Sequence, residues 1–338
     1  MKKTAIDYLN FGLAGIFIVM LILYGVTLLQ KKEFDRLNWS AQIIGVKPES
    51  VDEKSGMLKI LDAVFINSSN KYVTKLDDAS PLLFFSHEES DSGFFRTQND
   101  LLPDSLSVKY FSFEDKKFYH LNAKLSLEKM YDCLENKDLE ANLKIEIHPG
   151  GKISLKVEQP ESENFGIKLI HNFQAKEIPG TLKMLVDGSG RKDYDFSLMK
   201  GVSDYSDILT QKYLWKVKIE TEGSEDILNT SAYTFYGKSI RTDNETFEDV
   251  LLRDIPESIV IKWGNTQHYE IGYSFDGQEI LDAFKDLDKI KSSEPAVITF
   301  KVLKNSLPKA EISKAGKTIQ LKDTYPNYPA KIHYRLGC

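Results

Sequence analysis

Six histidines are spread along the chain, and none lies in a spacing typical of a reactive site: His87, His120, His148, His171, His268 and His333. The sequence contains no H-E-x-x-H zinc motif, no G-x-S-x-G nucleophile elbow and no Walker A loop. Asp187-Gly-Ser-Gly190 is rich in glycine, but no strand-to-helix context surrounds it, which favours a structural turn. We therefore expect no enzyme, no cofactor and no metal. A catalytic triad formed by residues distant in sequence remains the open alternative.

One loop sets three carboxylates beside two aromatic rings, and these residues are Glu88, Glu89, Asp91, Phe94 and Phe95. Aromatic anchors with a charged rim are typical of protein interfaces. An acidic loop would also be steered rapidly toward a basic partner. The loop is therefore our candidate partner-binding site. The alternative is that the two phenylalanines begin a strand and at least one of them packs inward.

The C-terminal run from Tyr325 to Tyr334 is a second candidate binding segment. Its prolines prevent a helix, because proline lacks the backbone N–H that helix hydrogen bonds require. Its tyrosines can stack on a partner or on the domain that precedes them. The second arrangement is the favoured one.

The composition limits the class of partner. The chain has 338 residues with 44 Lys+Arg and 50 Asp+Glu, a formal net charge of −6. An acidic balance argues against a nucleic-acid partner. There are two cysteines, Cys133 and Cys338, too few for a disulfide scaffold or a zinc ribbon. Whether they pair is left open, as is the oligomeric state.

The N-terminus carries an uncharged run from Tyr8 to Gln30. About 20 apolar residues of helix cross the hydrocarbon core of a bilayer. The run predicts an uncleaved signal anchor at residues 9–30, with residues 1–8 in the cytoplasm. Lysines flank both ends almost equally, so the orientation rests on the long following domain. The expected location is a bacterial inner membrane, crossed once, with the C-terminal domain in the periplasm.

The rest of the chain contains a repeated order of features. Leu102-Pro-Asp-Ser-Leu-Ser-Val-Lys-Tyr110 corresponds to Ile255-Pro-Glu-Ser-Ile-Val-Ile-Lys-Trp263, and each is followed by a helical pattern, at about 126–136 and 278–288. Strands that begin with Trp39 and Trp215 precede them. Pro149-Gly-Gly151 separates two alternating runs and predicts a hairpin.

We expect an α+β fold class: an N-terminal transmembrane helix followed by two tandem, β-rich α+β modules. The expected bounds are 38–180 for the first module, 181–212 for a linker, 213–325 for the second module and 326–338 for a C-terminal tail. Chance similarity between β-rich segments is the alternative to a repeat.

The stretch from Leu102 to Tyr119, the following helix and Ile147-His-Pro-Gly-Gly151 resemble a family of bacterial envelope proteins. The resemblance covers about residues 102–176. These proteins are commonly lipoproteins of unknown function, and some resemble immunity partners of secreted antibacterial toxins. The chain departs from the family because a predicted spanning helix replaces the lipidated cysteine. The resemblance implies no catalytic residues.

These patterns together predict a membrane-anchored periplasmic protein that binds and blocks a protein partner. The resemblance implies that this partner is a secreted toxin and the chain an immunity protein. The alternative is a bitopic structural or assembly component of a cell-envelope machine. Neither function requires a cofactor.

Overall fold

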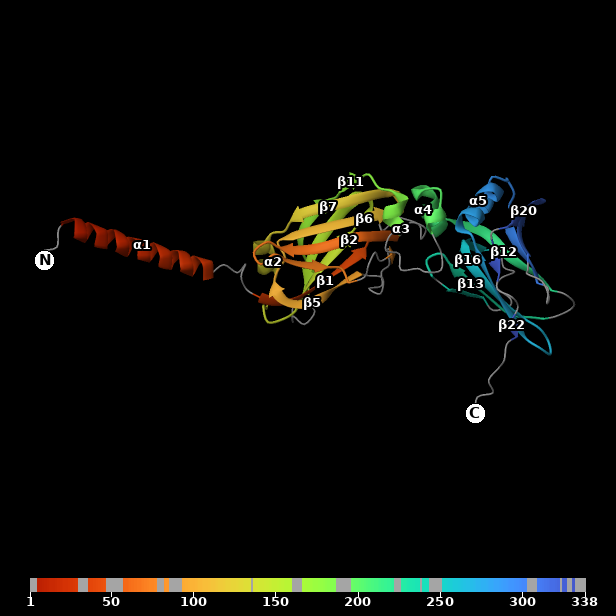
Figure 1. Ribbon diagram of the computed structural model, residues 1–338, viewed down its shortest axis with the longest axis horizontal. Coiled ribbons are helices and arrows are strands. Elements are labelled where there is room, and N and C mark those ends of the chain that lie inside the picture. Colours follow the sequence, from red (N-terminus) through yellow and green to blue (C-terminus); the bar gives the residue numbers. More distant parts are fainter. Residues whose placement is uncertain are drawn as a thin grey trace, which may run out of the picture. The chain divides into compact units, whose positions relative to one another are not determined.

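The computed structural model describes residues 5–29, 36–46, 57–77, 82–84, 93–134, 136–159, 166–186, 196–221, 226–237, 239–242, 251–302, 309–322, 324–326 and 330–331. The chain divides into two compact units (Figure 1). Unit 1 comprises Met1–Glu49 and Gly56–Pro179, and unit 2 comprises Ser50–Ser55 and Gly180–Cys338. Each unit is described by itself below.

Unit 1 contains two sheets and two helices. Its helices are α1 (Ala5–Leu29) and α2 (Leu127–Cys133). The strands are β1 (Arg36–Gly45), β2 (Met57–Asn67), β3 (Tyr72–Lys75), β4 (Leu82–Phe84), β5 (Gly93–Leu101), β6 (Ser105–Ser112), β7 (Lys117–Lys124), β8 (Ala141–Ile147), β9 (Lys152–Glu158), β10 (Lys168–Gln174) and β11 (Lys176–Ile178). Sheet A has the order β10-β9-β8-β1-β5. Sheet B has the order β11-β7-β6-β2-β3, with β4 also paired to β2.

Unit 2 repeats this arrangement. Its helices are α3 (Leu182–Val186), α4 (Val202–Thr210) and α5 (Gly277–Asp288), with a 3₁₀ turn η4 (Phe196–Leu198). The strands are β12 (Lys212–Thr221), β13 (Ile227–Thr234), β14 (Ser239–Thr242), β15 (Leu251–Asp254), β16 (Pro256–Trp263), β17 (Tyr269–Phe275), β18 (Ala296–Val302), β19 (Lys309–Lys314), β20 (Lys317–Leu321), β21 (Thr324–Pro326) and β22 (Ala330–Lys331). Sheet C has the order β15-β12-β18-β19-β20. Sheet D has the order β14-β13-β16-β17-β21, with β22 on β17.

The pairing registers show that the two units share one topology. Trp39 on β1 lies opposite Ala141 of the parallel strand β8, and Trp215 on β12 lies opposite Ala296 of the parallel strand β18. The two tryptophans therefore hold equivalent positions, as their place in the sequence predicts. Pro103 and Pro256 likewise lie where β6 and β16 begin.

Near its end, each of these two strands, β6 and β16, carries an aromatic residue that stacks on the next strand. Tyr110 stacks on Tyr119 with ring centroids 5.3 Å apart, and Trp263 stacks on Tyr269 at 5.5 Å. Each stack joins a cross-strand pair, from β6 to β7 or from β16 to β17. The repeat therefore extends from strand order to individual side-chain contacts.

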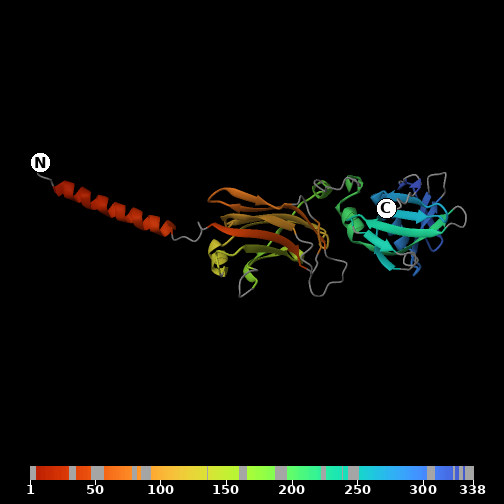
Figure 2. The ribbon, with the colours of Figure 1, turned by 90° about the horizontal axis from the view of Figure 1, so that it is seen from below.

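The core of unit 1 lies between sheets A and B, which form two stacked layers (Figure 2). Trp39 of sheet A meets Phe65 of sheet B edge-on, with ring centroids 5.8 Å apart. In unit 2, Tyr273 of sheet D and Phe300 of sheet C approach to 4.3 Å between centroids. Both units are therefore two-sheet sandwiches, against which their short helices pack.

The predicted hairpin and both predicted helices are present. Gly150 and Gly151 have φ values of 72° and 81° in the turn between β8 and β9. A Cβ on Gly151 would also lie 2.9 Å from the ring of Tyr119. Position 151 therefore requires glycine for two reasons, its positive φ and the lack of space for a side chain. The Ser126 side chain accepts from the backbone N–H of Lys129 and caps α2, and Asp276 caps α5 in the same way.

The structure corrects the predicted linker at 181–212, because this stretch is part of unit 2. It contains α3, η4 and α4, and α4 packs on α5 of unit 2. Lys285 of α5 bridges Asp204 and Asp207 of α4, with Nζ–carboxylate distances of 2.7 Å to each. The stretch is rich in Gly, Asp, Ser and Lys, which is why its sequence suggests a linker.

The predicted membrane span is contradicted. Within the part of the chain that the structure describes, no helix is long and apolar enough to cross a membrane.

This finding overturns four expectations: the signal anchor at residues 9–30, the inner-membrane location, the periplasmic placement and the transmembrane part of the expected fold class. The α+β description is corrected as well, because strands dominate both units.

The α4–α5 bridge gives a test of how firmly the former linker belongs to unit 2. Lys285→Met leaves Asp204 and Asp207 facing each other and should lower the free energy of unfolding by about 2 kcal/mol. Lys289→Met is the matched control, since Lys289 and its partner Asp286 are exposed. It should change stability by less than about 0.5 kcal/mol. Equal effects in urea denaturation would contradict the assignment.

The same variant should change the response to acid. Burial alone would raise the pKa of Asp204, but hydrogen bonds from Lys285 and Gln278 outweigh it and lower that pKa. The contact therefore contributes stability above the ordinary carboxylate pKa of about 4, and this contribution is lost as the pH falls. Lys285→Met should lose less stability than the native chain between about pH 5 and pH 2.

Candidate functional site

Two of the five predicted binding residues lie in the described part of the chain, both on β5. Glu88, Glu89 and Asp91 lie outside the described residues. Phe94 is 52% exposed, whereas Phe95 is 2% exposed and meets Phe65 at 5.1 Å between ring centroids. The inward-packing alternative is therefore correct for Phe95. Phe94 remains a candidate contact residue.

The opposite directions of the two rings follow from strand geometry. Successive side chains of a strand point to opposite faces, and directly paired residues share a face. Phe95 pairs with Ala41, which faces the core, and Phe94 pairs with Gln42. Phe94 therefore lies on the face of sheet A that points away from the core. We call this the outer face of sheet A.

A single row of side chains crosses this outer face on all five strands. The registers join Phe94 to Gln42, Gln42 to Lys144, Lys144 to Lys156 and Lys156 to Leu169. The two ends of the row are apolar and half exposed, because Leu169 on β10 is 51% exposed. The next two residues of the row after Phe94, which are Gln42 and then Lys144, are buried.

Ion pairs neutralise the charges of this row. Lys156 Nζ lies 2.6 Å from an oxygen of Glu146. Lys144 Nζ lies 3.9 Å from Glu158, and both of these side chains are only 9% exposed. The outer face of sheet A therefore presents apolar residues at its two edges and paired charges between them.

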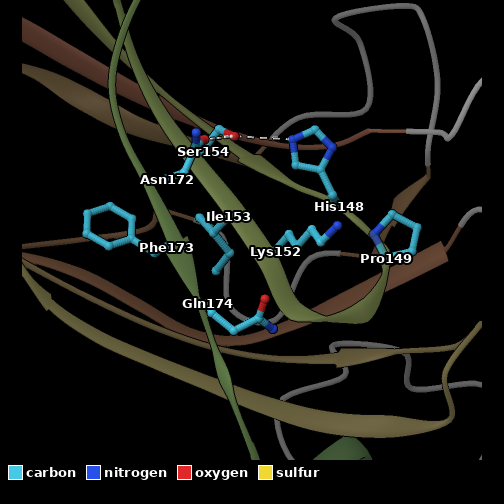
Figure 3. Close-up of a pocket in the computed structure, with 8 residues that line it drawn as sticks. All are labelled: His148, Pro149, Lys152, Ile153, Ser154, Asn172, Phe173 and Gln174. Atoms are coloured by element: carbon cyan, nitrogen blue, oxygen red, sulfur yellow. Dashed lines mark hydrogen bonds between the residues drawn. The ribbon is translucent and has the colours of Figure 1, made fainter.

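A pocket of about 660 Å³ lies where this face meets the turn from β8 to β9 (Figure 3). Its lining residues are His148, Pro149, Lys152, Ile153, Ser154, Asn172, Phe173 and Gln174. We call it the His148 pocket. Its volume lies within the range of small-molecule sites in proteins.

Burial holds the pKa of His148 below its ordinary value. Lys156 and Lys152 act in the same direction, and Glu146 opposes them. The imidazole is therefore neutral near pH 7. A neutral ring has one nitrogen that accepts and one that donates.

The pocket contains a serine and a histidine, and a glutamate lies beside it, but the three do not have the arrangement of a hydrolase. Ser154 Oγ lies 3.4 Å from His148 Nε2, and a Glu146 oxygen lies 3.8 Å from the same nitrogen. A catalytic triad needs the nucleophile and the acid on different ring nitrogens. Ser154 also donates to Asn172 Oδ1 at 2.8 Å, which orients its proton away from the imidazole. The geometry suits binding rather than acyl transfer.

Metal chemistry finds no support among the described side chains, because no three His, Cys, Asp or Glu residues there gather closely enough to hold an ion. Cys133 at the end of α2 carries a free thiol, and Cys338 lies outside the described residues.

The C-terminal candidate segment packs back on unit 2. Its described parts, β21 and β22, both pair with β17 and so extend sheet D. Tyr325 lies opposite Ser274. The sequence favoured packing of this segment on the second module, and the described residues of the segment do pack there.

Comparisons with protein-family models, with curated proteins and with solved structures find no match to this chain.

Sequence reasoning missed the row across sheet A and the His148 pocket. The alternating charges at Lys144, Glu146, Lys156 and Glu158 did signal a polar face on this hairpin. The His148-Pro-Gly-Gly turn marked the place of the pocket. Neither signal tells which other strands lie beside the hairpin. The sequence therefore could not predict that Gln42, Phe94 and Leu169 lie on the same face of the sheet as the hairpin charges.

The opposite burial of neighbouring phenylalanines gives a direct test. Phe95→Ala should lower the free energy of unfolding by about 3–5 kcal/mol, because it leaves a cavity beside Phe65. Phe94→Ala should change it by less than about 0.5 kcal/mol, because that ring is half in water. Chemical denaturation of the two variants measures both values. A larger loss for Phe94→Ala would reverse the assigned faces.

Proposed function

We propose that this chain binds another protein through the outer face of sheet A in unit 1 and acts by covering a surface of that partner. The observation that carries the proposal is Phe94, an aromatic side chain that is half exposed on the edge strand of a rigid sheet. Aromatic residues on rigid elements supply much of the binding energy of protein interfaces.

The neighbours of Phe94 support this role. Gln42 is buried beside it, Lys144 is buried on the next strand, and Leu169 gives a second exposed apolar side chain at the opposite edge. An interface of this kind has apolar contacts together with polar groups that already have partners. The proposal requires no reacting group, in keeping with the geometry of Ser154 and His148.

Inhibition of an antibacterial toxin is the particular form of this function that the sequence resemblance implies. No family match supports it, so it remains the narrower hypothesis. The broader proposal of protein binding rests on the outer face of sheet A alone.

A photo-crosslinking phenylalanine analogue at position 94 tests the contact in the source cells. Leu252 is the matched control position, because it is 54% exposed on β15, the edge strand of sheet C that corresponds to β5. We expect a defined crosslinked partner from position 94 and none from position 252. Crosslinks from position 252 alone would overturn the proposed face.

The identified partner then allows a quantitative test with the full chain. Titration calorimetry should reach its end point near an equimolar ratio. Phe94→Ala should weaken binding at least tenfold, mainly through faster dissociation, and Leu252→Ala should leave it unchanged. Turnover of the partner by the chain would contradict occlusion and favour an enzyme. Unchanged binding by Phe94→Ala would contradict the assigned contact.

A further inference from the structure

The His148 pocket holds hydrogen-bond donors that the protein itself does not use. Among the described residues the Lys152 ammonium has no ion-pair or hydrogen-bond partner, and the side chain is exposed. Asn172 Oδ1 accepts from Ser154, which leaves the amide N–H groups of Asn172 free to donate. An ammonium and an amide donor on neighbouring strands are the groups that bind a carboxylate by charge-assisted hydrogen bonds.

From these donors we propose that the His148 pocket is a carboxylate-binding site, with Lys152 and Asn172 as its donors. The proposal does not depend on protein binding by the outer face of sheet A, because a small acid is enough to fill the pocket.

The carboxylate already present beside the pocket does not repel such a ligand. Glu146 is bound by Lys156 at 2.6 Å, so its charge is neutralised within the protein. Lys152 then gives the pocket an excess of one positive charge. Protonation of His148 would add a second.

The walls define the rest of the ligand. Pro149, Ile153 and Phe173 add apolar surface to the pocket, and Figure 3 shows the Phe173 ring and the Lys152 side chain on opposite sides of Ile153. The His171 ring lies 4.5 Å from that of Phe173 and supports its orientation. A carboxylate carried on an apolar group therefore fits a lining that is partly charged and partly apolar.

Unit 2 does not have this chemistry on the equivalent strands. The pair Glu146 and Ser154 of unit 1 corresponds to Lys301 and Lys309, which lie opposite each other on β18 and β19. These positions of unit 2 therefore have neither a serine like Ser154, which orients the Asn172 amide, nor a glutamate like Glu146, which binds Lys156. The site is therefore a property of unit 1 and not of the shared scaffold.

The groups around His148 predict the pH dependence of binding. Glu146 on β8, Lys152, Ser154 and Lys156 on β9, and Asn172 on β10 face the imidazole. Burial lowers the pKa of His148, so the ring gains its proton only at acid pH. A bound anion favours the protonated ring, and by linkage affinity rises as the pH falls through that pKa.

Phenylacetate and its neutral isostere phenylacetamide are the probes for a first test with the full chain. Calorimetry or histidine NMR at pH 7 should show saturable binding of phenylacetate and at least tenfold weaker binding of phenylacetamide. Binding should tighten between pH 7 and pH 5.5. No saturation by phenylacetate, or equal binding of the two probes, would overturn the proposal.

Two variants and one control assign the donors. Lys152→Gln should weaken phenylacetate binding at least tenfold, and Asn172→Asp should do the same by placing a negative charge at the site while keeping its shape. Lys75→Gln is the control, since Lys75 is an exposed lysine on β3 of the other sheet. An equal loss in the control would show nonspecific attraction and reject the site.

A further probe separates the two sources of such a carboxylate. N-acetylphenylalanine carries its carboxylate as the C-terminus of a polypeptide does, beside a backbone amide. Tighter binding of this probe than of phenylacetate assigns the site to a chain terminus, and weaker binding assigns it to a free organic acid. Failure of both probes removes the carboxylate site and leaves the Phe94 crosslinking result unaffected.

Discussion

Each unit depends on one parallel strand pair at the centre of a sheet. β1 pairs with β8 and β12 with β18, and a buried tryptophan occupies the first paired position in both. Parallel neighbours cannot be joined by a hairpin, so the chain must leave the sheet and return by a crossover. It uses that crossover to build most of the second sheet and a helix, and the remaining strands β11, β21 and β22 join that sheet later in the chain. The core between the two layers, with Trp39 against Phe65, is the product of this single constraint.

The shared scaffold carries different charges in its two copies. The diagonal pair of Glu146 and Lys156 in unit 1 becomes Lys301 and Glu311 in unit 2, with the signs exchanged. The pair in unit 1 is tight at 2.6 Å, whereas the pair in unit 2 is 3.8 Å apart. Both units have the same strand order with either arrangement of the signs, so the exchange changes the charges that the shared scaffold carries.

Local signals in the sequence predicted local structure well. The Pro149-Gly-Gly151 hairpin and the helices near 126–136 and 278–288 each rest on patterns that act over a few residues, and all three are present in the structure. The repeat could be read because its aromatic and proline positions are set by the same core contacts in both units.

Longer-range features were not predictable in the same way. The helices inside 181–212 depend on packing against α5, which composition alone does not reveal. Phe94 and Phe95 have the same chemistry, and only the register against Gln42 and Ala41 decides which of them is exposed. The uncharged run at the N-terminus predicted a membrane crossing that the described residues contradict.

The burial of charge on the outer face of sheet A bears on what that face does. Desolvating a charged side chain is costly, and a partner that covers exposed charges must supply that energy on binding. Lys144 and Glu158 are already removed from water within the unit, and Lys156 is held by Glu146. A protein that covers this face has therefore only the rim to desolvate, and the rim residues Phe94 and Leu169 are apolar. The folding of unit 1 has therefore already desolvated these charged side chains, and their desolvation does not oppose association with a partner.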